Sequence, residues 1–503
     1  MGAPAANTTR IFNVGWSGLP HFAPPQRKGK IRLINGLLRH LKRQQKRTNM
    51  ASDHAPTILI INAQIVNEGK ITAADVFVKA GMIEKIGSDL RHLKANRVID
   101  AGGKFLFPGV IDDQVHFREP GLTHKATIAS EARAAVAGGT TSFMEMPNTV
   151  PNALTQRLLS DKYDIAARTS LANYSFFMGA SNDNYEQVMQ TDPRTICGIK
   201  IFMGSSTGSM LVDNEAVLER LFANAPVLIA THCEDERTVR ARTEMFRGLY
   251  PDAVPADIHA MVRNEEACLK STTLAMSLAK KHRTRLHILH ISTGEESILF
   301  DVAPSTPTTN QPKLITAEAC VHHLWFDARD YQRLGNLIKC NPAIKAVQHK
   351  EKIFQALLDD RIDVIATDHA PHTWAEKQQP YWNAPSGLPL VQHALNVMLE
   401  FYAQGRISLP KIAQKMSHAV ADCFQIDRRG YIREGYWADL VLVDINQQTT
   451  VQKDNVLYQC GWSPLEGTTF QSRVTHTIVS GRLVYANGVF DGSAMGERLA
   501  FIR

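Results

Sequence analysis

Eight short apolar segments, separated mostly by helix-forming segments, occupy the middle of the chain and limit the folds it can adopt. The strand candidates are residues 105–116, 140–147, 175–180, 197–204, 226–234, 286–293, 314–324 and 363–371. Ala- and Leu-rich stretches such as IASEARAAVA and NEEACLKSTTLAMSLAKKH lie between most of them. Strands that alternate with helices predict a parallel sheet, and eight is the strand number of a (β/α)8 barrel, whereas doubly wound sheets usually have fewer.

Polar residues stand at the carboxyl end of one strand candidate after another. They are His116, Asn148, Lys200, His232, His290 and Asp368. In a (β/α)8 barrel the carboxyl ends of all strands meet at one mouth, which is where active sites of this fold lie. The α/β pattern therefore predicts a TIM-like (β/α)8 barrel with these side chains gathered at one site.

Short β-rich stretches flank the barrel region on both sides. TILIINAQIV and DVFVKAGMIEKIG follow residue 56, and WADLVLVDI and VTHTIVSGRLVYANG lie near the C-terminus, with a predicted hairpin turn at Asn487 and Gly488. We expect both ends to form one small β-sandwich domain. The predicted organisation is a basic, disordered extension (1–56), a β domain from residues 57–107 and 431–503, and the barrel (108–430).

The formal net charge of +7 comes from one segment of the chain. Residues 1–49 contain ten basic residues and no acidic one, so the remainder carries −3. The stretch KIRLINGLLRHLKRQQKR is compatible with a basic amphipathic helix that contacts a membrane surface, an import receptor or nucleic acid. We favour a disordered extension, or sequence upstream of a start at Met50, and expect no nucleic-acid or membrane partner.

The seven cysteines are scattered and form no CxxC pair. An odd number at irregular spacing predicts reduced thiols in a cytoplasmic protein rather than a disulfide framework. No apolar run approaches the ~20 residues that a membrane-spanning helix needs.

Three imidazoles and a carboxylate at one mouth favour a metal site. His116, His232, His290 and Asp368 offer donors that suit Zn²⁺ or a similar divalent ion. Lys200, in GIKIFMG, would be costly to bury in its charged form. As a neutral amine it can take up carbon dioxide and become a carbamate whose two oxygens can bridge two metals. Without the histidines, Lys200 would be interpreted as a snorkelling or salt-bridged residue.

Several longer motifs resemble those of a known family. PGVID, HFREPG, AAVAGGTTSFMEMPNT, GIKIFMG, THCEDE, LHILHIST, ITAEACVHHL, NPAIK and ATDHAPH occur in order from about Ile58 to the C-terminus. Together they resemble the dihydroorotases of the amidohydrolase superfamily, of the large single-chain type. FREPG, MPNT and ATDHAPH distinguish dihydroorotases from hydantoinases and allantoinases better than the metal residues do. The family fold is the barrel with a β domain built from both termini.

The resemblance implies a two-metal centre, and we expect one or two zinc ions per chain. Lys200, in its carboxylated form, would bridge the ions, and His232 and His290 would hold one of them. His116 and Asp368 would hold the other, with Asp368 also the catalytic base and acid. The substrate-binding positions that match are Arg118, Asn148, Asn341, His372, Pro385 and Gly387. Arg118 suits a carboxylate because its guanidinium is a planar fork, and asparagine and histidine add directional hydrogen bonds.

Gln114 departs from the family pattern. The chain has Gln-x-His where the family usually has His-x-His. An amide carbonyl can ligate a metal, but it is a weaker donor to zinc than imidazole. Gln114 is therefore a doubtful ligand, and we predict that the metal beside it binds weakly or is absent.

The resemblance implies reversible hydrolysis of (S)-dihydroorotate to N-carbamoyl-L-aspartate by metal-activated hydroxide, in pyrimidine biosynthesis. The expected partner is this small-molecule substrate, and barrels of this kind are often homodimers. One alternative is a related cyclic amidase, a hydantoinase or an allantoinase. Another is a catalytically silent dihydroorotase-like subunit, which Gln114 favours and the retained His232, His290, Lys200 and Asp368 oppose.

Overall fold

The computed structural model describes residues 56–204, 210–255, 257–302, 313–492 and 495–503. The predicted extension, residues 1–56, lies outside the described part except for its last residue. Among the described residues, no helix is both long enough and apolar enough to cross a membrane.

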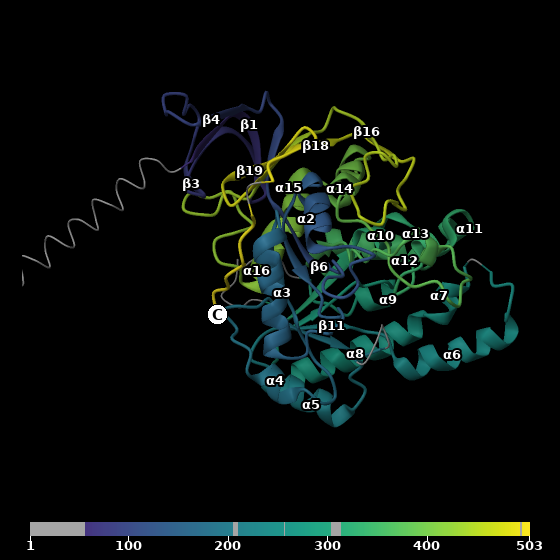
Figure 1. Ribbon diagram of the computed structural model, residues 1–503. Helices are drawn as coiled ribbons and strands as arrows, with labels where there is room; N and C mark the ends of the chain where they lie inside the picture. Colours follow the sequence, from purple (N-terminus) through teal and green to yellow (C-terminus); the bar gives the residue numbers. More distant parts are fainter. Residues whose placement is uncertain (1–55, 205–209, 256, 303–312, 493–494) are drawn as a thin grey trace, which may run out of the picture. The chain divides into compact units, whose positions relative to one another are not determined.

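A ring of parallel strands forms the barrel, of which Figure 1 labels β6 and β11. Its strands are β6 (Val110–Val115), β7 (Thr140–Glu145), β8 (Asn173–Phe176), β9 (Met178–Gly179), β10 (Ile199–Phe202), β11 (Ile229–His232), β12 (Leu286–Ile288), β13 (Ile315–Cys320) and β14 (Val364–Ala366). β8 pairs with β7 and β9 with β10, and only Phe177 separates them, so they occupy one strand position. A backbone hydrogen bond of 2.7 Å from His116 N to His369 O joins the residues that follow β6 and β14, the first and last strands of the ring. The predicted TIM-like barrel is confirmed.

Helices connect the strands. They are α2 (Ile128–Ala137), α3 (Gln156–Thr169), α4 (Tyr185–Met189), α5 (Glu215–Asn224), α6 (Glu236–Leu249), α7 (Ile258–Val262), α8 (Glu265–His282), α9 (Gly294–Ser297), α10 (Val321–Trp325), α11 (Tyr331–Leu334), α12 (Val347–Leu358), α13 (Trp374–Lys377), α14 (Ala394–Ala403), α15 (Leu409–Ala413) and α16 (Ala419–Phe424). α8 shows why the predicted helices form: Asn264 caps its first turn through Ala267 N, and Lys280 and Lys281 stand in the last turn, where the helix dipole favours cations.

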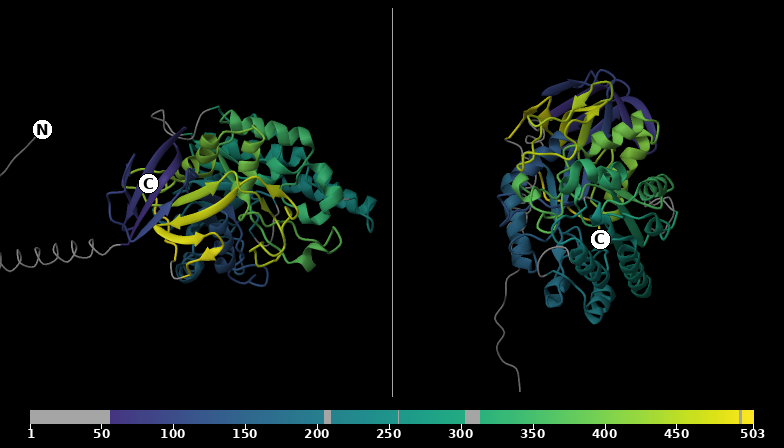
Figure 2. Two further views of the ribbon diagram at one scale, coloured as in Figure 1. Left: turned by 90° about the horizontal axis from the view of Figure 1, so that it is seen from above. Right: turned by 90° about the vertical axis from the view of Figure 1, so that its right-hand side faces the viewer.

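The N-terminal and C-terminal strands share one sheet, as predicted. Figure 2 shows the purple and yellow strands side by side in both views. The strands are β1 (Thr57–Asn67), β2 (Lys70–Lys79), β3 (Met82–Gly87), β4 (Arg97–Asp100), β5 (Phe105–Pro108), β15 (Leu440–Asp444), β18 (Arg473–Val479), β19 (Arg482–Ala486) and β20 (Val489–Phe490), with β16 (Thr449–Thr450) and β17 (Thr469–Phe470) as a separate pair. β5 pairs with β15, and residues from both ends, such as Ile60 and Leu442, share one hydrophobic cluster.

The predicted hairpin between β19 and β20 is confirmed. Asn487 and Gly488 form its two-residue turn with φ of 48° and 92°. Both angles are positive, as a type I′ turn requires, and asparagine and glycine tolerate this conformation best.

Two strand predictions need correction. Residues 105–116 are not one strand, because β5 belongs to the β domain and β6 to the barrel. The chain changes sheets at Gly109, where an added Cβ would lie 2.1 Å from Thr141 Oγ1. Residues 314–324 are also not one strand, since β13 ends at Cys320 and α10 begins at Val321.

Candidate active site

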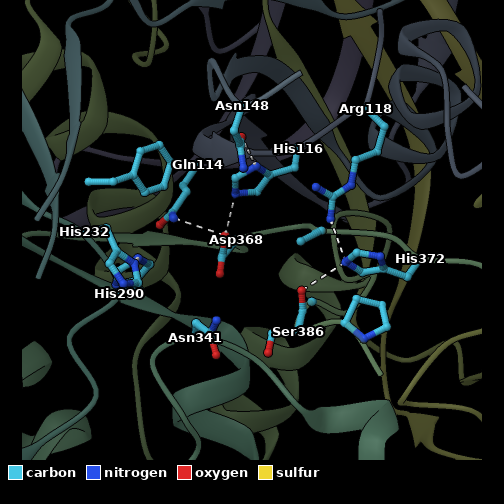
Figure 3. Close-up of a pocket in the computed structure, with 14 residues that line it drawn as sticks. Gln114, His116, Arg118, Asn148, His232, His290, Asn341, Asp368, His372 and Ser386 are labelled. Carbon is cyan, nitrogen blue, oxygen red and sulfur yellow. Dashed lines mark hydrogen bonds and ion pairs between the residues drawn. The ribbon is translucent and has the colours of Figure 1, made fainter. Parts of the chain in front are cut away.

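The carboxyl ends of the barrel strands surround a pocket of about 210 Å³ (Figure 3). Its lining residues are Gln114, His116, Arg118, Asn148, Phe202, His232, His290, Asn341, Asp368, Ala370, His372, Pro385, Ser386 and Gly387. Every site residue expected from the sequence is among them except Lys200. The structure thus brings together residues that lie more than 270 positions apart in the chain.

His116 and Asp368 form one side of the pocket. His116 Nε2 lies 3.0 Å from Asp368 Oδ1, and His116 Nδ1 lies 2.8 Å from Asn148 Oδ1. If the Asn148 oxygen accepts from Nδ1, the Nε2 lone pair faces the carboxylate, and a cation or a shared proton is needed between them. Burial raises the pKa of Asp368, but the hydrogen bond and charge of His116 outweigh it and keep that pKa below its usual value. Asp368 is therefore ionised at neutral pH.

Gln114 contacts Asp368 through its amide nitrogen. Gln114 Nε2 donates to Asp368 Oδ1 at 3.1 Å, and the amide oxygen is 3.9 Å from Cys320 Sγ. In this orientation the carbonyl, the group that could ligate a metal, does not point at Asp368. The doubtful role of Gln114 as a ligand in the pocket remains a prediction.

His232 and His290 form a second side of the pocket. His232 Nδ1 lies 3.0 Å from His290 Nε2, and His232 Nε2 lies 3.0 Å from Glu234 Oε2. Burial lowers the pKa of both imidazoles, and for His290 the neighbouring His232 lowers it further. Neutral imidazole is the form that binds metals. Within the described part of the chain, His290 Nδ1 has no hydrogen-bond partner, which is costly for a buried polar atom unless an unseen group binds it.

Lys200 is fully buried on β10, beside the pocket residue Phe202. Its Nζ lies 4.6 Å from the Phe202 ring centroid and has no hydrogen-bond partner among the described residues. Burial lowers the pKa of Lys200 to about 8, although Asp368 and Glu318 oppose the shift. A buried amine without partners fits a group that is modified or metal-bound, and it does not fit the snorkelling alternative.

Three of the predicted site residues have left-handed backbone conformations. The φ angles are 69° for Arg118, 41° for His290 and 47° for Asp368. Such angles cost free energy in residues other than glycine, and they persist where the surrounding structure enforces them, often at active sites. Each of these three residues follows a barrel strand, and its strained backbone conformation directs its side chain into the pocket.

Arg118 and His372 form a third side, across the pocket from His232 and His290 (Figure 3). Arg118 Nε donates to Pro371 O at 3.0 Å, and Arg118 Nη2 lies 3.1 Å from His372 Nε2. Lys125 Nζ lies 3.1 Å from His372 Nδ1, and an ammonium can only donate. His372 Nε2 therefore carries the proton and donates to Ser386 O at 3.0 Å. This leaves the Arg118 Nη2 protons available to a ligand.

The loop at Pro385 and Gly387 is held by Lys377, which the sequence did not single out. Lys377 Nζ donates to Pro385 O at 2.9 Å and to Gly387 O at 2.7 Å. Its side chain is buried, and burial lowers its pKa to about 7. Ser386, Ala370 and Phe202 were also missed, and only their positions beside predicted residues could have indicated them.

Replacing Gly387 with alanine is expected to impair ligand binding at this loop. Gly387 has φ of +138°, and an added Cβ would lie 2.5 Å from Ala370 O and 3.0 Å from His372 Cδ2. The loop or its neighbours Ala370 and His372, which also line the pocket, must shift, so we expect a raised KM and a lower melting temperature. Gly405→Ala is the matched control, because Gly405 also has positive φ (+72°) but open space around its Cβ position. Equal effects of the two substitutions would contradict the steric explanation.

Comparisons with known proteins agree with this architecture. The model of the amidohydrolase family matches residues 105–484. The dihydroorotase of Halobacterium salinarum is 31% identical over 411 residues, which cover 81% of this chain and 92% of that protein. The allantoinase of Deinococcus radiodurans is 29% identical over 88% of this chain and 98% of that protein. The L-hydantoinase structure from Arthrobacter aurescens has a TM-score of 0.83 at 24% identity, over 88% of this chain and 99% of that one.

The barrel, the pocket at its mouth and the family match define the class of protein. The chain belongs to the amidohydrolase family, and it is a metal-dependent enzyme of the cyclic-amidohydrolase class. Within that class, several dihydroorotases reach 30% identity or more over four fifths of the chain.

Proposed function

We propose that this enzyme is a dihydroorotase, which reversibly hydrolyses (S)-dihydroorotate to N-carbamoyl-L-aspartate. The observation that carries the proposal is Arg118, which lines the pocket beside His116 and across from His232 and His290 (Figure 3). A guanidinium with free protons suits a substrate that bears a carboxylate. The dihydroorotases at about 30% identity support the same substrate. The reverse reaction would serve pyrimidine biosynthesis, in the cytoplasm.

The donor set of the pocket fits zinc. His232, His290 and the Lys200 carbamate would hold one ion, and His116, Asp368 and the same carbamate a second, weaker one beside Gln114. Among the described residues, His290 Nδ1 and Lys200 Nζ have no hydrogen-bond partner, which supports this assignment. When bound, the metal supplies Lewis acidity that polarises the ring carbonyl and acidifies water.

Lys200 would be modified before it serves as a ligand. Its neutral Nζ attacks the carbon of carbon dioxide, an N–C bond forms, and one proton leaves the nitrogen, which gives an anionic carbamate. The low pKa of Lys200 increases the fraction of neutral amine available for this step.

Asp368 would move the proton during hydrolysis. Water adds to the ring carbonyl carbon while Asp368 accepts its proton, and Asp368 then delivers that proton to the ring nitrogen as the carbon–nitrogen bond breaks. Arg118, Asn148, Asn341 and His372 would orient the substrate, with backbone groups of Pro385 and Gly387 along the ring edge.

Replacing Arg118 with methionine is expected to weaken the binding of dihydroorotate. Hydrogen bonds to charged groups contribute about 1.5–3 kcal/mol, so KM should rise by about 10- to 100-fold. Arg118→Lys keeps the positive charge but loses the planar guanidinium, so its KM should lie between those of the unchanged enzyme and Arg118→Met. Steady-state kinetics measure the effect. A KM within twofold of the unchanged enzyme would remove Arg118 from substrate recognition.

The alternatives differ in the substrate. The Deinococcus allantoinase and the Arthrobacter L-hydantoinase share the fold, so a related cyclic amide is the second candidate. Assaying the enzyme on dihydroorotate, hydantoin and allantoin separates them. Activity on a neutral ring with none on dihydroorotate would favour the second candidate, and inactivity on all three with metal bound would favour a silent subunit.

A further inference from the structure

A cysteine and two histidines form a buried cluster outside the residues assigned above. Cys320 ends β13, and His322 and His323 lie in α10. One donor atom from each lies within 4.8 Å of the others. The exposed fractions are 0% for Cys320, 0% for His322 and 4% for His323. Two adjacent helix residues normally point in different directions, yet these two rings have centroids 4.1 Å apart.

Three of the four imidazole nitrogens of this cluster lack a hydrogen-bond partner among the described residues. Within the described residues, no well-formed hydrogen bond reaches either ring nitrogen of His322 or His323 Nδ1, although the Thr367 backbone lies near enough to the His322 ring to oppose the lowering of its pKa by burial. His323 Nε2 lies 3.1 Å from the carbonyl oxygen of Pro342, which can only accept. His323 Nε2 is therefore the protonated nitrogen, which leaves the Nδ1 lone pair free to bind an ion. Metal-binding histidines are oriented in this way by a carbonyl behind the ring.

Gln114 provides a fourth donor. Its carbonyl oxygen lies 3.9 Å from Cys320 Sγ, while its amide nitrogen donates to Asp368. Two ligands of a tetrahedral zinc ion, with Zn–S of about 2.3 Å and Zn–O of about 2.1 Å, lie roughly 3.6 Å apart. The amide oxygen is thus near the distance that a shared ion requires.

We propose that Cys320, His322 and His323, with the Gln114 carbonyl as fourth donor, bind a zinc ion separate from the metals of the pocket. Zinc is favoured because a thiolate with two imidazoles suits it better than Mg²⁺ or Ca²⁺. Without metal, Cys320 Sγ donates to Glu318 Oε1 at 3.1 Å. Binding breaks that hydrogen bond and releases the thiol proton to solvent, and the neutral histidines release none. The ion would hold the Gln114 carbonyl so that its amide nitrogen stays on Asp368.

A second buried cluster, Asp113, His287 and Glu318, does not need an ion. His287 Nε2 lies 3.1 Å from Asp113 Oδ2 and 3.9 Å from Glu318 Oε2. A protonated imidazole between two carboxylates accounts for the group, since Cys423, Asp113 and Glu318 together raise the pKa of His287 against the effect of burial. This cluster contains no sulfur among its three members, and neither do the donors proposed for the pocket.

Sulfur therefore distinguishes the proposed zinc site from every other candidate. The full-length protein loaded with Co²⁺ should show a near-ultraviolet thiolate-to-cobalt charge-transfer band. Cys320→Ser should abolish the band and lower the zinc content of the zinc-loaded protein by one ion per chain. The serine hydroxyl can still donate to Glu318, so the fold has little reason to fail.

Two other cysteines provide controls. Cys233 is adjacent to His232, but its Sγ donates to Thr231 Oγ1 at 3.2 Å, and Cys197 is buried elsewhere in the barrel. Cys233→Ser and Cys197→Ser should both keep the band. A band that survives Cys320→Ser, or no band in the unchanged protein, would overturn the proposal.

X-ray absorption at the zinc edge tests the site without a variant. The unchanged zinc-loaded protein should show a sulfur scatterer at about 2.3 Å from zinc. A shell of nitrogen and oxygen alone would overturn the proposal even if Cys320→Ser did not fold. Neither outcome depends on which amide the enzyme hydrolyses.

Discussion

The Asp368→Asn enzyme is expected to hydrolyse dihydroorotate about 10²- to 10⁴-fold more slowly, the range that a positioned general base contributes. Asparagine has the same shape but cannot accept the proton of water or deliver it to the ring nitrogen. Substrate affinity, measured by calorimetry, should change little, because Arg118 and the loop at Gly387 remain. Metal content is determined on the same sample, since Asp368 is also a proposed ligand.

Asp363→Asn is the matched control for Asp368→Asn. Asp363 lies just before β14, whereas Asp368 follows that strand. The buried carboxylate of Asp363 pairs with Lys313 Nζ at 3.0 Å. Loss of this pair should lower stability and leave kcat nearly unchanged. An Asp368→Asn enzyme that retains its metal and turns over at a rate within a few-fold of the unchanged enzyme would refute the assigned role.

Replacing Lys200 with alanine is expected to abolish activity and strongly reduce the metal content. The substitution removes the carbamate that would link both ions. It also leaves a cavity where the side chain was, so added acetate or formate should restore part of the activity by supplying a carboxylate. Intact mass under non-denaturing conditions should show one carbon dioxide on the unchanged chain and none on the variant.

Lys162→Met tests whether loss of any buried lysine reduces activity and metal content as Lys200→Ala is expected to do. Lys162 is as buried as Lys200, but its Nζ pairs with Glu145 Oε2 at 3.0 Å and donates to Met146 O at 2.9 Å. Removing it should cost stability, because Glu145 loses its partner, while the folded fraction keeps its metal. Full metal content in Lys200→Ala would refute the bridging role.

The barrel and most of the pocket could be predicted because strand order fixes where strand ends meet. Once eight parallel strands close into a ring, His116, His232, His290 and Asp368 must approach one another whatever the loops do. The split at Gly109 was missed because apolar strands of both sheets follow each other without a polar break. Only the tight contact with Thr141 marks the change of sheet.

Contacts made by loops and by side-chain rotation could not be predicted. Nothing in the spacing of Lys377 indicates that it anchors the carbonyls of Pro385 and Gly387. The CVHH stretch gave no metal signal either, because adjacent helical residues are not expected to converge. The orientation of the Gln114 amide likewise could not be predicted, because it depends on contacts with Asp368 and Cys320 that only the folded chain brings together.

The measurement that tests the account most directly is the rate of dihydroorotate hydrolysis by the purified, zinc-loaded enzyme, with hydantoin and allantoin assayed beside it. Absorbance follows the loss of dihydroorotate, and metal content is determined on the same sample. We predict turnover of dihydroorotate well above that of either neutral ring. No turnover of dihydroorotate after addition of zinc and bicarbonate, by protein that has bound its metal, would contradict the proposed function.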